Sequence, residues 1–252
     1  MKFICIIPAR YASTRFPGKP LADIAGKIMI QRVYEQALKA IDNVWVATDD
    51  FRIYDAVQSF GGKAVMTSEN HKSGTDRVYE AYEKIGDESD VVINIQGDEP
   101  FIQQQQIEIL KDCFDNKDVQ LATLVKPFSK EDGFDALFNA NSPKVVINKN
   151  KEAIYFSRSI IPYVRGVDHT NWLNSILFYK HIGMYAYRSD ILREIVQLPQ
   201  STLELAESLE QLRWIENGYR IKVGFTDMET IGIDTPEDLD KALQFLLRRD
   251  CH

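Results

Sequence analysis

Residues 6–21 read IIPARYASTRFPGKPL, in which a short apolar run stops at a proline and a basic stretch follows. The apolar run ends with Cys5, Ile6 and Ile7 before Pro8, a pattern typical of the end of a buried strand. In open α/β sheets, ligands bind beyond the carboxyl ends of the strands, so the stretch predicts a site for a polyanion. A solvated basic loop is the alternative that composition leaves open. The polar groups and the glycine that would form the site are Arg10, Ser13, Thr14, Arg15, Gly18 and Lys19.

The stretch is not a Walker A loop, because Gly18-Lys19 is followed by Pro20 where that motif needs Ser or Thr. The chain also lacks a glycine-rich dinucleotide fingerprint, and the pair Gly61-Gly62 before KAVMT is typical of a turn. Phosphate recognition would therefore depend on side-chain cations as much as on backbone amides.

The first half of the chain alternates strand-like and helix-like segments, which predicts βαβ units and a parallel sheet. Its strands are almost continuously apolar, so we expect helices on both faces of this sheet. The expected pairs are FICIIP with IMIQRVYEQALKA, VWVATD with FRIYDAVQSF, KAVMT with TDRVYEAYEKI, and VVINIQ with QQQIEILKDCF.

The middle of the chain has more β character and fewer helices, which predicts a smaller mixed or antiparallel insertion. Helices are expected near 189–197 and 203–217, and a strand is expected at IKVGF. After that strand, Thr235 has the position of an N-cap, with Pro236 at the first helical position and Asp238 at the third.

Bulk properties limit the class of protein. With 252 residues and no linker, repeat or low-complexity tract, the chain is expected to form one compact unit. Its net charge of −7 argues against a general nucleic-acid binder. Three scattered cysteines indicate a reducing cytoplasm, and no apolar run approaches membrane length. We expect a cytoplasmic protein without nucleic-acid or membrane partners.

The stretch PARYASTRFPGKPL resembles the nucleotide-binding signature of the 3-deoxy-D-manno-octulosonate (Kdo) cytidylyltransferases. The similarity continues in order along nearly the whole chain, through SGTDR at 73–77, NIQGDEP at 94–100, FSR at 156–158, HIGMYAYR at 181–188, LEQLR at 209–213 and DTPEDL at 234–239. It implies a Rossmann-like nucleotide-diphospho-sugar transferase fold and a homodimer. It also implies one domain, 1–252, with a nucleotide-binding half at about 1–125, an acceptor-sugar and dimerisation region at about 126–226 and a metal-ligand segment at 227–252.

Carboxylates in two of these motifs are candidates for metal binding. Asp98 and Glu99 follow an apolar strand, and Mg²⁺ favours one or two carboxylates together with phosphate oxygens. The two side chains point apart in an extended backbone, and the resemblance selects Asp98. The resemblance also implies that Asp234 joins Asp98 in binding Mg²⁺, with two ions expected. A polar turn at Asp98 and an Asx-type turn at Asp234 are the alternatives.

The loop 73–77 leads into a helix, where Ser73 or Thr75 is a candidate N-cap. The resemblance implies instead that it lines the base or ribose pocket, with backbone groups near Pro8 to Arg10 also recognising the base. The nucleotide contacts implied by the resemblance are Pro8, Ala9, Arg10, Arg15, Lys19, Ser73, Gly74, Thr75, Arg77, Gln96 and Asp98.

For the acceptor sugar, the resemblance implies binding by Gln96, Arg158, His181, Tyr185, Glu210 and Gln211. A sugar carboxylate needs a cation or hydrogen-bond donors, so Arg158 would supply charge and His181 and Tyr185 would donate. Tyr185 lies four residues beyond His181, which places both on one side of a strand. Ordinary polar residues of a mixed sheet, and a solvated helix face for Glu210-Gln211, are the alternatives.

The resulting hypothesis is transfer of a cytidylyl group from CTP to Kdo for lipopolysaccharide biosynthesis, with Arg10, Lys19, Asp98 and Asp234 as catalytic residues. A nucleotidyltransferase for another acid, such as 8-amino-Kdo, or for another nucleotide is the nearest alternative. A glycosyltransferase is disfavoured, because an Asp-x-Asp motif is expected there and the chain reads QGDEP. A non-catalytic nucleotide sensor would bind nucleotide without releasing pyrophosphate.

Overall fold

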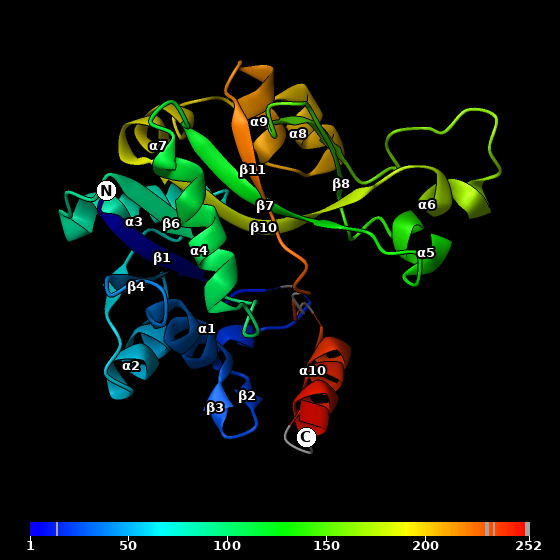
Figure 1. The fold of residues 1–252 in the computed structure, drawn as a ribbon. Helices are drawn as coiled ribbons and strands as arrows, with labels where there is room; N and C mark the ends of the chain where they lie inside the picture. The colour runs from blue at the N-terminus through cyan, green and yellow to red at the C-terminus, as the bar shows by residue number, and fades with distance from the viewer. Residues whose placement is uncertain (14, 230–231, 234, 250–252) are drawn as a thin grey trace. The chain divides into compact units, whose positions relative to one another are not determined.

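The computed structural model describes residues 1–13, 15–229, 232–233 and 235–249 (Figure 1). The chain folds into two compact units. Unit 1 comprises residues 1–107 and 230–252, and unit 2 comprises residues 108–229. The expectation of one domain with boundaries near 125 and 226 stays a prediction. Among the described residues, no helix is both long enough and apolar enough to cross a membrane.

Unit 1 is built on a parallel sheet, as its alternating segments predict. β1 pairs with both β4 and β6, and β4 pairs with β5, all in parallel. Ile4 to Ile7 of β1 are completely buried, and successive strand residues face opposite sides, so both faces of β1 are covered. The strands are β1 (Phe3–Ala9), β2 (Asp23–Ile24), β3 (Lys27–Ile28), β4 (Val44–Thr48), β5 (Ala64–Met66) and β6 (Val91–Asn94), with β2 and β3 forming a separate small sheet.

The helices of unit 1 confirm the expected 3.6-residue pattern. In α1 the buried face consists of Met29, Ile30, Val33, Tyr34 and Ala37, whereas the neighbouring Leu38 is 40% exposed. Ser73 caps α3 by accepting from the backbone N–H of Asp76 at 3.1 Å. The helices are η1 (Lys19–Leu21), α1 (Met29–Leu38), α2 (Phe51–Ser59), α3 (Gly74–Ile85) and α10 (Pro236–Arg249), while α4 (Gln104–Asp112) runs across the boundary between the units.

The predicted start of α10 is confirmed in detail. The hydroxyl of Thr235 accepts from the N–H of Asp238, and the Asp238 carboxylate accepts from the N–H of Thr235, each at 3.2 Å. This reciprocal pair satisfies two backbone donors that a helix start leaves without partners. An apolar cluster then holds the helix to unit 1, and its buried members are Ile24, Met29, Phe101, Ile233 and Ala242, with Phe16 packed against them.

Unit 2 contains the expected mixed sheet. β10 is antiparallel to β7 and to β8, β8 is antiparallel to β9, and β11 is parallel to β7. Its strands are β7 (Leu121–Pro127), β8 (Lys144–Ile147), β9 (Ala153–Ser157), β10 (Tyr179–Arg188) and β11 (Ile221–Phe225). Its helices are η2 (Cys113–Asp115), α5 (Gly133–Phe138), η3 (His169–Asn171), α6 (Trp172–Ser175), α7 (Ser189–Ile195), α8 (Thr202–Glu207) and α9 (Gln211–Glu216).

The single helix expected at 203–217 is wrong, because the structure has two short helices there. Ser208 adopts a left-handed conformation with φ of 52°, which ends α8. The two helices are then joined by a buried ion pair, in which Nε of Arg213 in α9 donates to Glu204 in α8 at 2.8 Å. The periodicity of the segment is helical on both sides of Ser208, so the sequence pattern does not reveal the break.

The ion pair between α8 and α9 supplies a test of the fold. Replacing Glu204 by Gln removes the carboxylate that balances the nearly buried Arg213 charge and should lower the free energy of unfolding by about 3–5 kcal/mol. The matched control is Glu35→Gln, which breaks an exposed pair with Lys27 and should cost less than about 1 kcal/mol. Urea unfolding measures both changes. Equal losses in the two variants would contradict a structural role for the buried pair.

Candidate functional site

The carboxyl ends of β1 and β6 lie at the same edge of the sheet, because the strands are parallel and Ile6 is opposite Asn94. A cavity of about 470 Å³ opens there, which we call the basic pocket. Three segments line it: the stretch after β1, the start of α3 and the stretch after β6. Its lining residues are Pro8, Ala9, Arg10, Ala12, Ser13, Arg15, Lys19, Pro20, Ser73, Gly74, Arg77, Gln96, Gly97 and Asp98.

The stretch after β1 is folded back on itself. The N–H of Gly18 donates to the carbonyl of Tyr11 at 3.0 Å, and the hydroxyl of Ser13 accepts from the N–H of Phe16 at 3.3 Å. Gly18 has a φ of 71°, a left-handed conformation that glycine adopts without strain. These bonds arrange the cationic side chains of Arg10, Arg15 and Lys19 around one cavity, where a polyanion would meet them.

The stretch after β6 approaches β1 closely. A β-carbon on Gly97 would lie 2.9 Å from the carbonyl oxygen of Pro8, so glycine is required at this point. The next residue, Asp98, accepts from Nζ of Lys19 at 2.7 Å. The backbone carbonyl of Asp98 also accepts from the N–H of Ile233 at 3.0 Å, which ties the C-terminal segment to the floor of the site. Asp234, the second predicted metal ligand, lies outside the described residues.

Arg77 is the most enclosed cation of the basic pocket, with an exposure of 1%. One terminal nitrogen donates to the carboxylate of Asp49 and the other to the hydroxyl of Thr67, both at 2.6 Å. Asp49 follows β4, the parallel neighbour of β1, so it reaches the site from the same edge of the sheet. A buried guanidinium held at two points has a fixed orientation toward a ligand.

The segment between β5 and α3 is held by Glu80. Its carboxylate accepts from the N–H of Ser68 at 2.8 Å and pairs with His71 and with Lys84. Burial opposes ionisation, but the hydrogen bonds from Lys84, Ser68 and His71 prevail and lower the pKa of Glu80 to about 2. The carboxylate is therefore charged at neutral pH and fixes the approach to Ser73 and Gly74.

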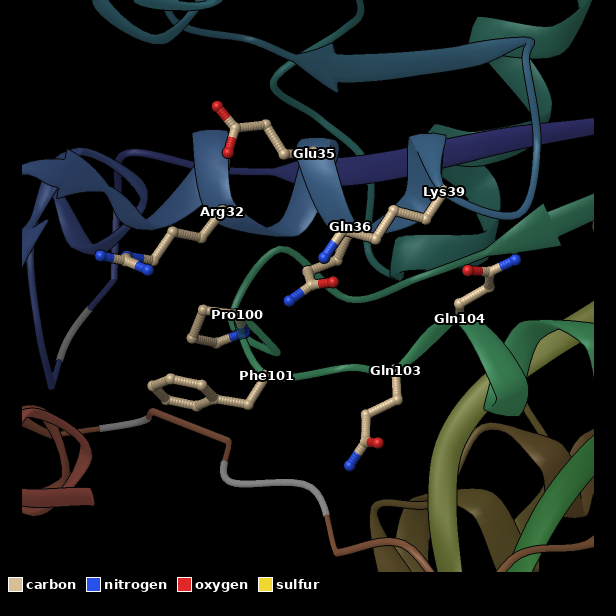
Figure 2. Close-up of a pocket in the computed structure, with 8 residues that line it drawn as sticks. All are labelled: Arg32, Glu35, Gln36, Lys39, Pro100, Phe101, Gln103 and Gln104. Atoms are coloured by element: carbon tan, nitrogen blue, oxygen red, sulfur yellow. The ribbon is translucent and has the colours of Figure 1, made fainter. Parts of the chain in front are cut away.

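A second groove of unit 1, of about 430 Å³, differs in character from the basic pocket. Figure 2 shows α1 across from the segment 100–104, with Gln36 pointing toward that segment and Glu35 pointing away from it. The guanidinium of Arg32 already donates to the carbonyls of Ile24 and Ala25, and the Glu35 carboxylate already accepts from Lys27 and Gln31. Two of its ionised groups, Arg32 and Glu35, are therefore engaged by other residues of unit 1.

In unit 2, the structure brings His181 and Tyr185 together. Their ring centroids lie 5.4 Å apart, and both side chains are nearly buried. A regular strand would place residues i and i+4 about 13 Å apart. A bulge in β10 between Ile182 and Tyr185 shortens this separation, and Thr123 lies opposite Tyr185 on β7. Neither the bulge nor the position of Thr123 was predicted, and Gly183 was the only local signal in the sequence.

Tyr185 also contacts helix α9. The Tyr185 ring makes an edge contact with Trp214 at 5.2 Å. Burial raises the pKa of the Tyr185 phenol well above its ordinary value, and electrostatic interactions with Tyr187 and Glu210 raise it further. The phenol therefore keeps its proton. Gln211 is 2% exposed, which excludes a solvated face for this residue, and Glu210 is half-buried.

Arg158 is engaged with the backbone of unit 2. Its guanidinium donates to the carbonyl oxygens of Glu207 at 2.7 Å, Ala140 at 3.0 Å and Ser208 at 3.3 Å. Its backbone N–H donates to the Glu207 carboxylate. In this structure Arg158 joins the end of β9 to the end of α8, and its role toward a sugar carboxylate stays a prediction.

Comparison with known proteins identifies the family. A family model described as "Cytidylyltransferase" matches residues 4–222, which include the basic pocket and the neighbouring rings of His181 and Tyr185 in β10. The chain belongs to the cytidylyltransferase family. Proteins named 3-deoxy-manno-octulosonate cytidylyltransferase resemble it along their length. The one from Parabacteroides distasonis is 69% identical, covering 99% of this chain and 100% of the relative, and the one from Bacteroides thetaiotaomicron is 64% identical with the same coverage.

Solved structures agree with this assignment. A structure of CMP:2-keto-3-deoxy-manno-octonic acid synthetase in complex with CTP matches the cytidylyltransferase with a TM-score of 0.90 and 45% identity, covering 99% of this chain and 100% of the other. A 4-diphosphocytidyl-2C-methyl-D-erythritol synthase from Anaerococcus prevotii matches with a TM-score of 0.62 and 14% identity over 98% and 99% of the two chains. The second likeness concerns the fold alone.

The basic pocket of this cytidylyltransferase gathers every nucleotide contact implied by the resemblance except Thr75, which is buried in the first turn of α3. Of the residues predicted for the polyanion site after β1, Gly18 is not part of the pocket lining, and Thr14 lies outside the described residues. Gln96, predicted for both substrates, lines the pocket in unit 1. Sequence reasoning missed Asp49 and Thr67, which hold Arg77. The signal for Asp49 was available, since it follows an apolar strand at the ligand-binding edge of a parallel sheet.

The buried His181 gives a pH dependence of stability. Burial lowers its pKa from 6.5 to about 3, so between these values the unfolded chain binds a proton that the folded cytidylyltransferase does not. Stability should therefore fall as the pH falls through this window, by up to about 1.4 kcal/mol per pH unit. Urea unfolding from about pH 7.5 to about pH 5 should show a steeper loss for the wild type than for His181→Gln. Parallel curves would contradict the burial of a neutral imidazole.

Proposed function

We propose that the chain is a 3-deoxy-manno-octulosonate cytidylyltransferase, which joins the cytidylyl group of CTP to the octulosonate and releases pyrophosphate. The observation that carries this proposal is the convergence of Arg10, Arg15 and Lys19 with Asp98 in one cavity at the carboxyl edge of a parallel sheet. Relatives bearing that name cover essentially the whole chain. The product, CMP-Kdo, would serve lipopolysaccharide biosynthesis.

The reaction is an in-line displacement at the α-phosphorus of CTP. The anomeric hydroxyl of the octulosonate loses its proton to water and forms the new O–P bond, and the bond from the α-phosphorus to the pyrophosphate oxygen breaks. Such a transfer depends mainly on positioning and electrostatics and needs no covalent enzyme intermediate. Arg10, Arg15 and Lys19 would bind the triphosphate and stabilise the charge that develops on the departing pyrophosphate. The fixed guanidinium of Arg77 would hold the nucleoside end of CTP.

The residues of the basic pocket fit Mg²⁺. Asp98 offers an oxygen ligand beside a cavity large enough for phosphate groups, and Mg²⁺ commonly takes one or two carboxylates plus phosphate oxygens. Asp98 and Asp234 would hold the metal, with two ions expected, and the hydrogen bond from Ile233 to Asp98 brings the residue before Asp234 to the first ligand. When bound, Mg²⁺ would neutralise phosphate charge and lower the pKa of the attacking hydroxyl.

The acceptor sugar would be bound by Arg158, His181, Tyr185, Glu210 and Gln211 of unit 2, and the assignment of Gln96 to the sugar stays a prediction. Supporting this assignment, the rings of His181 and Tyr185 adjoin one another, and Gln211 is buried although it carries an amide. A buried amide nitrogen without a hydrogen-bond partner is costly, and among the described residues Nε2 of Gln211 has none. A bound sugar would supply the missing acceptor.

We also propose that the enzyme is a cytoplasmic homodimer that associates through the region 126–226. Large apolar side chains are exposed in this region, and a second copy would cover them. The most exposed are Phe138, Ile154, Tyr163, Leu177 and Leu205.

The activity is tested by incubating the purified protein with Mg²⁺, each of the four nucleoside triphosphates and the octulosonate, while pyrophosphate is measured. CTP with 3-deoxy-manno-octulosonate should release pyrophosphate at the highest rate. A higher rate with 8-amino-Kdo or another triphosphate would assign a different nucleotidyltransferase. Binding of CTP without pyrophosphate release would favour a nucleotide sensor.

Asp98→Asn should abolish pyrophosphate release, because it removes the ionised oxygen that would bind the metal. The fold should persist, since Asp98 lies at a solvent-accessible cavity and its backbone bond to Ile233 is unaffected. Circular dichroism checks the fold, and Asp55→Asn, an exposed aspartate of α2, is the matched control. Near-normal activity of Asp98→Asn would count against the metal assignment.

Asp49→Asn tests whether the orientation of Arg77 matters for the nucleotide. Weakening the charged hydrogen bond should raise the KM for CTP about ten-fold with a smaller change in kcat. Asp87→Asn is the control, because Asp87 is a half-buried aspartate that precedes β6, at the opposite end from the site. An unchanged KM for CTP in Asp49→Asn would show that Arg77 does not need this partner.

A further inference from the structure

The bulge in β10 gives the hydroxyl of Thr123 unusual surroundings. Between Ile182 and Tyr185 the strand contains two residues with no counterpart on β7. Carbonyl groups at a bulge lose their places in the strand ladder, and Oγ1 of Thr123 lies 2.7 Å from the carbonyl oxygen of Met184 and 3.3 Å from that of Ile182. The same Oγ1 lies 2.9 Å from Nε2 of His181.

The direction of each hydrogen bond follows from counting protons. A threonine hydroxyl has one proton to donate and lone pairs with which to accept. A carbonyl oxygen only accepts, so the proton of Thr123 is directed to the backbone, where Met184 is the nearer acceptor. The contact with His181 then requires a proton on Nε2, donated to Oγ1.

The rest of the surroundings keep this imidazole neutral. His181 is 8% exposed, and burial lowers its pKa to about 3, so the ring carries one proton at neutral pH. The ring of Phe156 packs edge-on against it at 5.0 Å, and the His181 backbone N–H donates to the carbonyl of Pro143. A neutral imidazole with its proton on one nitrogen has a lone pair on the other.

We infer that Thr123 fixes His181 in the tautomer protonated at Nε2, so that Nδ1 is a hydrogen-bond acceptor for a hydroxyl of the acceptor sugar. The part that concerns the sugar rests on the proposed function. Thr123 is then a positioning residue, and the role expected for His181 is reversed, because its donor is used within the protein. A lone pair facing a carboxylate is repulsive, so Nδ1 selects a hydroxyl of the octulosonate and not its carboxylate.

Gln211, another residue proposed to bind the sugar, carries a donor suited to the opposite role. Nε2 of Gln211 is buried and, among the described residues, has no acceptor. An amide N–H can bind a carboxylate or a sugar oxygen without carrying charge. His181 and Gln211 would thus distinguish a hydrogen-bond donor from an acceptor on the same substrate.

The tautomer can be measured without any substrate. Nitrogen-15 NMR of histidine-labelled protein near neutral pH should show His181 with a protonated Nε2 and an unprotonated Nδ1, its signals being assigned by their loss in His181→Gln. A proton on Nδ1, or on both nitrogens, would overturn the inference. Thr123→Ser should preserve the wild-type signals, whereas Thr123→Val, which removes the acceptor, should shift them toward the other tautomer.

Kinetics test the role toward the sugar. Thr123→Val should raise the KM for 3-deoxy-manno-octulosonate about two- to ten-fold while the KM for CTP stays unchanged, and Thr123→Ser should restore the wild-type value. Thr226→Val, which removes another buried hydroxyl of unit 2, controls for packing. An unchanged KM for the acid in Thr123→Val would overturn the hydroxyl-binding role. If the wild type did not turn over the octulosonate, the proposed function would fail while the NMR result stood.

Discussion

The close approach of two chain segments at the edge of the unit 1 sheet determines the rest of the site. Gly97 lies against the carbonyl of Pro8 so tightly that a β-carbon would have no room. Because β1 and β6 are parallel neighbours, this contact brings the cationic stretch after β1 beside the carboxylate after β6. The ion pair between Lys19 and Asp98 is its direct result. If the two segments lay farther apart, the short side chain of Asp98 could not reach Lys19 in the same cavity.

The two chemical roles of the enzyme are supported by different kinds of structure. The proposed nucleotide site uses strand ends and one helix start in unit 1, where charged side chains line a cavity that is partly open to solvent. Of the residues proposed for the acceptor in unit 2, His181, Tyr185 and Gln211 are buried, so their selectivity would depend on where individual protons lie. A charged site tolerates small displacements of the ligand, whereas a buried hydrogen-bond pattern does not.

Much of unit 1 could be predicted because local rules and tertiary structure agree there. The caps at Ser73 and Thr235, the parallel strands and the gathering of strand-end residues all follow from patterns a few residues long. Unit 2 was harder. The break at Ser208 requires a left-handed residue that is not glycine, and the helical periodicity continues across it. The burial of Gln211 and the proximity of His181 to Tyr185 depend on pairing between distant segments, which periodicity does not contain.

The bulge in β10 has a consequence for how the strand can change in length. It inserts two residues, an even number, so the side chains beyond it keep the facing they would have in an uninterrupted strand. Tyr185 and Tyr187 therefore still meet Trp214. Removing both extra residues would leave a regular antiparallel ladder in which Tyr185 and Tyr187 keep their face of the sheet, so the bulge could be lost without turning the strand.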